Sequence, residues 1–157
     1  MVQRLVRKKQ GGFNYLITLF VVAVVAVGAT HVAENTLTRL KREKEAQLLW
    51  TGRTYREAIR NYYENSPGTA KTYPPDLKAL LVDERATRIR RPLRRLYRDP
   101  VTDSEEWGLI FHESGGVMGV YSLSKSTPYK VDGFEDEEVQ FKNAKHYDEW
   151  RFIYQSK

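Results

Sequence analysis

The feature that most constrains this chain is an uncharged apolar segment near its N-terminus. Residues 13–33, FNYLITLFVVAVVAVGATHVA, contain no Asp, Glu, Lys or Arg. About 20 residues at ~1.5 Å each make a helix of ~30 Å, which matches the hydrocarbon core of a bilayer. The valines favour strands in water, but in lipid a lone helix satisfies its own backbone hydrogen bonds and a lone strand does not. We therefore predict a membrane-spanning helix over residues 13–33.

A short basic stretch precedes this segment. Residues 1–12, MVQRLVRKKQGG, carry four basic residues and end in two glycines. Basic residues on this side favour a cytoplasmic N-terminus, although further basic residues follow the segment, so the charge rule alone does not fix the orientation. Removing the four basic residues lowers the net charge from +6 to about +2. The basic composition is therefore a poor argument for a nucleic-acid partner.

The junction KKQGG–FNYLITLF resembles a class III, or prepilin, signal. The chain resembles the pseudopilins of type II secretion systems and the pilins of type IV pili. This resemblance implies that prepilin peptidase cuts between Gly12 and Phe13 and methylates the new amine of Phe13. A glycine suits such a site because it has no side chain to obstruct a protease at the membrane face. The apolar helix would stay attached, as an inner-membrane anchor and as the core of a filament.

Two other interpretations of the N-terminus stay open. An ordinary single-pass anchor would need no processing. A secretory signal peptide would be cut after Ala29, where Val27 and Ala29 are small, but its apolar region would be unusually long. The Gly12–Phe13 junction favours the pilin-like interpretation.

The chain departs from the family pattern at Ile17. The family usually has glutamate at this fifth mature position, where it is thought to pair with the N-terminal amine of a neighbouring subunit. An amine with a pKa near ~8 enters a filament core largely charged, and an unpaired buried charge costs several kcal/mol. Asn14 and Thr18 offer hydrogen bonds near Phe13 but no counter-charge. We infer that the chain is a tip or accessory subunit, or belongs to a pseudopilin branch that assembles differently.

The apolar helix is predicted to continue outside the membrane over residues 34–64. Apolar side chains recur at helical spacing, and charged ones between them are expected to face solvent. The apolar set is Leu37, Leu40, Leu48, Tyr55, Ile59 and Tyr62, with Tyr63 beside it, and the solvated set is Arg39, Glu43, Lys44 and Glu45. Ser66, Pro67 and Gly68 should end the helix.

Residues 65–157 predict one small globular domain. We expect a short helix over 74–85, turns at Asp99–Pro100 and Gly115–Gly116, and strands over 107–111, 117–124 and 149–154. A long helix, an α-rich connector and a small antiparallel sheet make an α+β fold. This order is similar to that of the major pseudopilin of type II secretion, the G subunit. The resemblance implies partners of three kinds, namely other pilin-like subunits, an inner-membrane assembly platform and membrane lipid.

Two charged runs are candidate interaction sites. Helical spacing would place an arginine stripe on one face, able to meet an acidic subunit, lipid head groups or DNA, or simply solvent. This stripe is Arg88, Arg91, Arg94, Arg95 and Arg98. The acidic run at 132–138 is either solvated, a dock for the arginine run of another copy, or a calcium site. Calcium is considered because the major pseudopilins, which the chain resembles, bind it in a C-terminal loop. The candidate ligands here are Asp132, Glu135 and Asp136. Calcium needs six or more oxygen ligands.

Nothing in the sequence indicates an enzyme or an obligatory cofactor. Cysteine is absent, which excludes disulfides, thiolate metal sites and a cysteine nucleophile. The three histidines, His31, His112 and His146, are far apart and match no metal-binding spacing. The serines near residue 122 lack the Gly-x-Ser-x-Gly pattern of a nucleophile elbow.

The departure at Ile17 generates a test. If the missing carboxylate limits assembly, Ile17→Glu should increase incorporation of the chain into filaments, because it supplies the counter-charge for the Phe13 amine. Incorporation is measured by recovery of the chain in sheared filament fractions, with Ile17→Gln as an uncharged control. Equal recovery of all three chains would show that this position is not limiting.

Overall fold

The computed structural model describes residues 11–85 and 88–156, and side-chain environments within them for residues 13–26, 36–85 and 88–156. The leader residues 1–10 of the predicted signal lie outside this described part. The chain divides into two compact units, residues 1–40 and residues 41–157, which are considered separately below.

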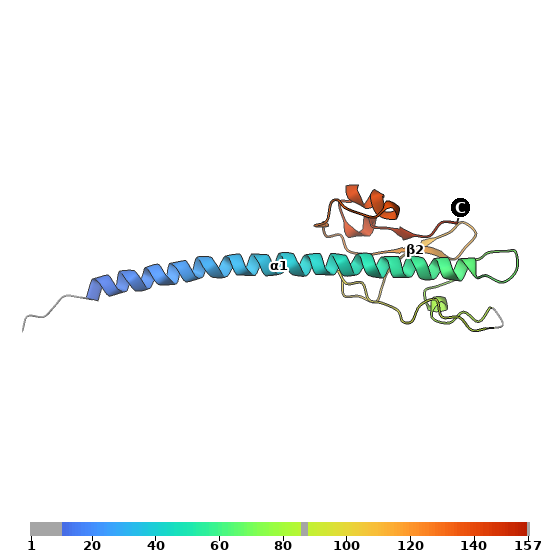
Figure 1. Ribbon diagram of the computed structural model, residues 1–157, viewed down its shortest axis with the longest axis horizontal. Helices are drawn as coiled ribbons and strands as arrows, with labels where there is room; N and C mark the ends of the chain where they lie inside the picture. The colour runs from blue at the N-terminus through green and yellow to red at the C-terminus, as the bar shows by residue number, and fades with distance from the viewer. Residues whose placement is uncertain (1–10, 86–87, 157) are drawn as a thin grey trace, which may run out of the picture. The chain divides into compact units, whose positions relative to one another are not determined.

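One helix, α1 (Gly11–Glu64), accounts for the N-terminal third of the chain (Figure 1). It confirms the helix predicted over residues 13–64. The end of the helix has a local cause, because Pro67 has no N–H to donate and Gly68 adopts a positive φ of 76°. The last amide bonds are Asn65 N to Asn61 O and Ser66 N to Tyr63 O, the second of which tightens the final turn.

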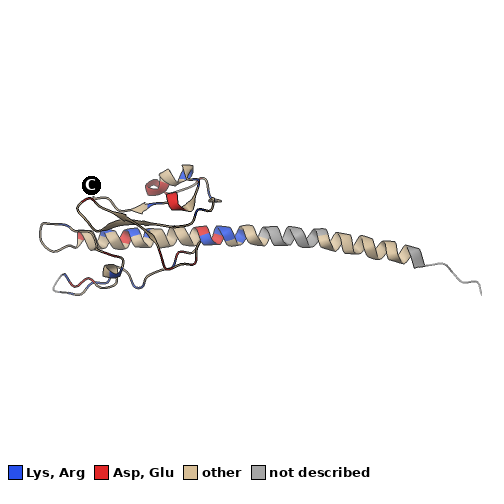
Figure 2. Cartoon of the chain, turned by 180° about the vertical axis from the view of Figure 1, so that it is seen from behind, with Lys and Arg blue, Asp and Glu red and all other residues tan. Residues whose placement is uncertain are grey.

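The described part of the first unit exposes an apolar helix surface. Residues 13–26 are uncharged, appear tan throughout in Figure 2, and include Phe13 and Phe20 at 72% and 69% exposure. Side chains 27–33 of the predicted span lie outside the described residues. Within the described residues, no helix is long and apolar enough to cross a membrane.

The connector after α1 is less helical than predicted. Instead of a helix over residues 74–85, the chain forms only the 3₁₀ turn η1 (Lys78–Leu80), where the Asp76 carboxylate accepts a hydrogen bond from the Ala79 amide. The helix cannot continue because Asp83 pairs in an isolated antiparallel bridge with Arg90, with N···O distances of 2.8 and 3.1 Å. Backbone groups used in that bridge are unavailable to a helix.

The sheet agrees with the predicted order. It contains β1 (Gly108–Phe111), β2 (Val117–Tyr121) and β3 (Phe152–Ile153), all antiparallel in the order β1-β2-β3. The predicted Gly115–Gly116 turn joins the first two strands, with φ values of 91° and 84° that favour glycine. The second and third strands are shorter than predicted, and the unit is α+β, as expected.

The predicted Asp99–Pro100 turn is also present, and Asp99 holds it together. This side chain is fully buried. One carboxylate oxygen accepts a hydrogen bond from the Val101 amide (2.9 Å), and the other accepts one from the Ser122 hydroxyl (2.6 Å). The turn is thereby fixed to the segment that follows β2.

The core of the second unit forms where α1 meets the sheet and the C-terminal segment. Leu48, Tyr55, Ile59 and Tyr62 are buried as predicted, whereas Leu37 and Leu40 of the same predicted stripe are exposed. On the other side of the interface lies a cluster of aromatic rings. Phe141 stacks on Trp150 at 5.6 Å and meets Phe152 edge to face at 5.2 Å.

Gly52 of α1 lies directly against the Phe152 ring in this core. A Cβ atom at Gly52 would lie 2.3 Å from two ring atoms of Phe152, which is fully buried. Glycine costs about 1 kcal/mol in a helix relative to alanine. Its presence here is explained by the space that the Phe152 ring occupies.

We predict that Gly52→Ala destabilises the protein by about 1–3 kcal/mol, because overpacking against Phe152 outweighs the gain in helix propensity. The measurement is the free energy of unfolding of the full chain in a nonionic detergent, from urea titrations followed by tryptophan fluorescence. Gln47→Ala, at an exposed position of the same helix, is the control and should change stability by less than about 0.5 kcal/mol. A stabilised Gly52→Ala chain would contradict the packing argument.

Candidate interaction surfaces

The arginine run does not form the helical stripe predicted for it. Residues 88–99 contain no helix, and the segment instead runs back along α1. Near its start, Arg90 and Arg91 border a pocket with Asn61 and Asn65. Further along, the Tyr97 amide donates to the Tyr55 hydroxyl at 2.8 Å. Pro92 and the bridge at Arg90 prevent a helix here, and the arginines form a track beside α1.

The arginines differ in whether they already have partners. Arg85 is fully hydrogen-bonded within the chain. Its guanidinium donates to both carboxylate oxygens of Asp83 and to the Tyr62 carbonyl. It also donates to the hydroxyls of Ser66 and Thr72. The side-chain hydrogen bond from Arg85 is the main cause that lowers the pKa of Asp83. Arg85 thus fixes the C-terminal end of α1.

The arginines of the predicted stripe are freer. Among the described residues, Arg88, Arg91 and Arg94 are exposed and make no ion pair, while Arg98 has only distant contacts of 3.8 and 4.0 Å to the exposed carboxylates of Asp103 and Glu105. The Arg95 guanidinium lies over the Tyr97 ring, 5.0 Å from its centre. These residues are therefore available to an external partner.

The end of the arginine track forms an open groove against α1. The groove has a volume of about 680 Å³ and is lined from α1 by Lys44 and Gln47, and from the track by residues 95–98. Next to it, Trp50 is 53% exposed and packs edge to face on Tyr97 at 5.2 Å. The groove therefore combines cations with an aromatic wall.

The acidic run is not the freely solvated loop that was one prediction for it. Part of it forms the 3₁₀ helix η2 (Asp136–Asn143), and three of its carboxylates pair with arginines of α1. Glu138 is fully buried and accepts two hydrogen bonds from Arg53, at 2.7 and 2.5 Å. The hydrogen bond to Glu138 raises the pKa of Arg53. Glu135 also pairs with Arg53 at 2.6 Å.

The candidate calcium ligands are not brought together. Glu135 contacts Arg53, whereas Asp132 contacts Lys142 at 3.1 Å and the Gly133 amide. Asp136 is exposed on η2. Across the residues that the structure describes, no group of three or more potential ligands is placed to hold a metal ion.

Glu45 was predicted to face solvent and is instead buried. Its carboxylate accepts hydrogen bonds from the amides of Tyr129 and Lys130 and from the Tyr147 hydroxyl, the last at 2.9 Å. Burial, together with the bond to Glu45, raises the pKa of Tyr147. Glu45 thus fixes residues 129–130 to α1.

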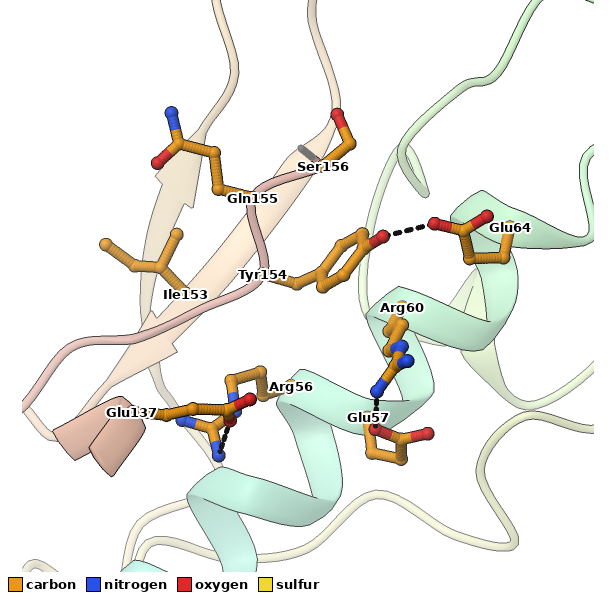
Figure 3. Close-up of a pocket in the computed structure, with 9 residues that line it drawn as sticks. All are labelled: Arg56, Glu57, Arg60, Glu64, Glu137, Ile153, Tyr154, Gln155 and Ser156. Atoms are coloured by element: carbon orange, nitrogen blue, oxygen red, sulfur yellow. Dashed lines mark hydrogen bonds and ion pairs between the residues drawn. The ribbon is translucent and has the colours of Figure 1, made fainter. Parts of the chain in front are cut away.

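A polar pocket lies between α1 and the C-terminal segment (Figure 3). The Tyr154 hydroxyl points to Glu64 and donates to it, and Arg56 reaches Glu137 at 2.6 Å. Burial and the bond to Glu64 raise the pKa of Tyr154 to about 12, so this phenol stays protonated at neutral pH. Arg60 pairs with Glu57 on the same helix at 3.6 Å. Arg56 and Arg60 are thus each paired with a carboxylate, and Glu64 accepts a hydrogen bond from the Tyr154 hydroxyl.

Ser122 and His112, one serine and one histidine of those considered above, have structural partners, whereas Nδ1 of His146 is buried without a hydrogen-bond partner among the described residues. The hydroxyl of Ser122 donates to Asp99, and within the described residues no histidine joins this pair. His112 contacts Ser114 in the turn after β1, with 2.7 Å between Nδ1 and Oγ. The side chain of His31 lies outside the described residues.

The predicted processing and assembly residues lie at the start of α1. Gly12 is inside the helix, and Phe13 and Ile17 are exposed at 72% and 47%. The Thr18 hydroxyl donates to the Asn14 carbonyl at 2.8 Å. Thr18 is therefore occupied by its own helix and is a poorer candidate than Asn14 for a contact with another chain.

Comparison with known proteins found no match among protein-family models, curated proteins or solved structures.

We predict that Glu138→Gln destabilises the protein by about 3–5 kcal/mol, because it leaves the Arg53 charge without its buried partner. Glu135→Gln is a matched control, since it removes an exposed carboxylate from the same arginine, and should cost at most about 1 kcal/mol. Urea unfolding of both full-length variants in the same detergent gives the comparison. Equal losses of unfolding free energy in the two variants would show that the burial of Glu138 does not determine its contribution to stability.

Proposed function

We propose that this chain is a pilin-like structural subunit, a pseudopilin of a type II secretion system, matured by prepilin peptidase and assembled through its N-terminal helix. Its role in this proposal is mechanical, to support protein export as part of a short periplasmic filament, without catalysis of its own. No cofactor is required for that role.

The observation that carries the proposal is the dual character of α1. Its described N-terminal residues 13–26 expose a continuous apolar surface without charge. Its C-terminal residues, from Leu48 to Tyr62, are instead the central wall of an α+β domain. An exposed apolar surface of this kind needs lipid or other apolar helices around it. A filament subunit that is stored in a membrane meets both of these surroundings, first lipid in the membrane and then the apolar helices of other subunits in the filament.

The second unit supports the proposal through its architecture. The order of a long helix, a connector and a three-stranded antiparallel meander agrees with the order expected from the pseudopilin resemblance, although the connector was expected to be α-rich and is mostly non-helical. Several of its charged side chains hold the C-terminal segment to α1, as with Arg53 and Glu138. This use fits a rigid structural domain better than a catalytic one.

The proposed placement follows from these two parts. Residues 13–33 cross the inner membrane once, the N-terminus is cytoplasmic and the globular unit is periplasmic. The partners are prepilin peptidase, other pilin-like subunits, the inner-membrane assembly platform and lipid. With Ile17 in place of the family's glutamate, the chain takes a tip or accessory position or assembles by a different contact.

We predict that processing depends on Gly12. In cells that contain prepilin peptidase, the wild-type chain should migrate faster on a denaturing gel than in cells that lack it, by the mass of a twelve-residue leader. Gly12→Leu should abolish this difference, since a side chain at the cut obstructs the protease, whereas Gly11→Leu, one residue earlier, should retain it. Cutting of the Gly12→Leu chain at the wild-type rate would refute the assignment of the site.

A further inference from the structure

We propose that the globular units of neighbouring copies dock head to tail, with the arginine track (residues 88–98) of one copy on the acidic turn (residues 132–140) of the next. The inference rests on the proposed function, for which it names a contact between subunits outside the apolar helix. It is carried by charge complementarity, by exposed apolar residues at both surfaces and by their positions on opposite sides of α1.

The arginine track has a large charge that the chain itself does not neutralise. It contains six arginines and no acidic residue. Arg88, Arg91 and Arg94 are exposed and, within the described part of the chain, have no ion pair. Arg98 contacts its carboxylates only at 3.8 and 4.0 Å, with both partners more than four-fifths exposed. Exposed ion pairs at such distances contribute little to stability. Arg98 can therefore exchange them for shorter ion pairs with a partner.

Exposed apolar side chains accompany these charges. Trp50 and Leu96 are 53% and 41% exposed, and Trp50 is held in place by its edge-to-face contact with Tyr97. Tryptophan, tyrosine and arginine are the residues that most often dominate the energy of protein interfaces. The combination of a positioned tryptophan with free arginines favours a protein surface as the partner.

The acidic turn is the complementary surface on the same chain. It contains five acidic residues and no basic one. Arg53 and Arg56 of α1 bind three of these carboxylates, but Glu135 and Glu137 keep 64% and 71% of their side chains exposed. Asp136 is exposed and has no ion pair among the described residues, and Val139 beside it is 58% exposed. The turn therefore offers negative charge around an apolar residue.

The two surfaces lie on opposite sides of α1. Gln47 lines the groove with the arginine track, and Arg56 pairs with Glu137 of the acidic turn. Nine residues at 3.6 per turn make two and a half turns, so these side chains point in opposite directions. Figure 1 shows the corresponding segments, yellow-green and orange-red, on either side of the helix within this unit.

Opposite placement prevents the two surfaces from meeting within one copy. Contact between copies then uses two different patches, which is a heterologous interface. Each added copy presents the same free pair of surfaces, so association continues along a line or closes into a ring and does not stop at a two-fold dimer. This geometry is the one that a filament subunit requires.

Nucleic acid is a less suitable occupant of the arginine track. Asp103 and Glu105 line the groove next to Arg98 and interrupt the positive charge that an extended phosphate backbone would follow. A compact acidic protein surface differs from a nucleic-acid strand because it need not follow the whole length of the groove. It can contact the arginines with its charges and Trp50 with its apolar residue. Binding of nucleic acid is therefore treated as an outcome of the test that would overturn the proposal.

The test uses the absence of cysteine from the chain. Leu96→Cys marks the arginine track and Val139→Cys marks the acidic turn, and neither substitution changes a charge. The full chain is studied in a nonionic detergent, whose micelles cover the apolar helix. After mild oxidation, a mixture of the two single-cysteine chains should give a mixed dimer at least tenfold more abundant than either homodimer. A chain with both cysteines should give a ladder of oligomers.

Charge reversal makes the test specific. Arg91→Glu with Arg94→Glu on the Leu96→Cys chain should reduce the mixed dimer at least tenfold, and so should Asp136→Lys with Gln140→Lys on the Val139→Cys chain. Combining the two reversed chains should restore the dimer, because the complementarity is re-established with opposite signs. Restoration also shows that both reversed chains are folded. Lys145→Glu with Arg151→Glu, at exposed positions outside both surfaces, changes the charge by −4 as the arginine reversal does, and this control should leave the dimer intact.

Three results would overturn the proposal. Homodimers of the Leu96→Cys chain as the main product would indicate a two-fold interface. A mixed dimer that is insensitive to both reversals would remove the electrostatic basis. A low-salt gel shift with a single-stranded oligonucleotide, lost in the Arg91→Glu/Arg94→Glu chain and accompanied by no mixed dimer, would assign the track to nucleic acid. Processing at Gly12 is measured separately, so that its presence without a mixed dimer would refute this contact and leave the proposed function standing.

Discussion

The globular unit depends on a helix that is buried from two sides. The face of α1 that carries Tyr55 and Tyr62 packs on the connector, while Arg53 and the small Gly52 receive the C-terminal segment. Because the Glu138 carboxylate is completely buried, its bond to Arg53 allows little variation in how that segment lies on the helix. Removing either side would expose large apolar and aromatic surfaces of α1.

Much of this fold could be predicted because it is encoded locally. The extent of α1, the glycine turn between β1 and β2 and the Asp99–Pro100 turn follow from helical periodicity and turn chemistry within a few residues. Two of the failures involve long-range contacts. Glu45 and Glu138 looked like ordinary surface charges, yet their partners lie 84–102 and 85 residues away. The predicted helix over 74–85 failed for a different reason, because Asp83 forms a backbone bridge with Arg90, seven residues further along the chain.

The two charged runs illustrate the same limit for function. Sequence spacing alone suggested a helical arginine stripe and a loose acidic loop. The structure replaces them with an extended track against α1 and a turn that is partly neutralised by Arg53 and Arg56. The sequence did indicate that one run carries an excess of positive charge and the other an excess of negative charge. What it could not indicate is that the excess charges lie on opposite sides of one helix, a relation that depends on the tertiary fold.

The most direct test of the central claim is the intact mass of the chain purified from membranes of cells that contain prepilin peptidase. The account predicts a chain that begins at Phe13 and carries one additional methyl group on its N-terminal amine. A chain that retains the residues before Phe13, or one that begins at Thr30 after a cut behind Ala29, would contradict it.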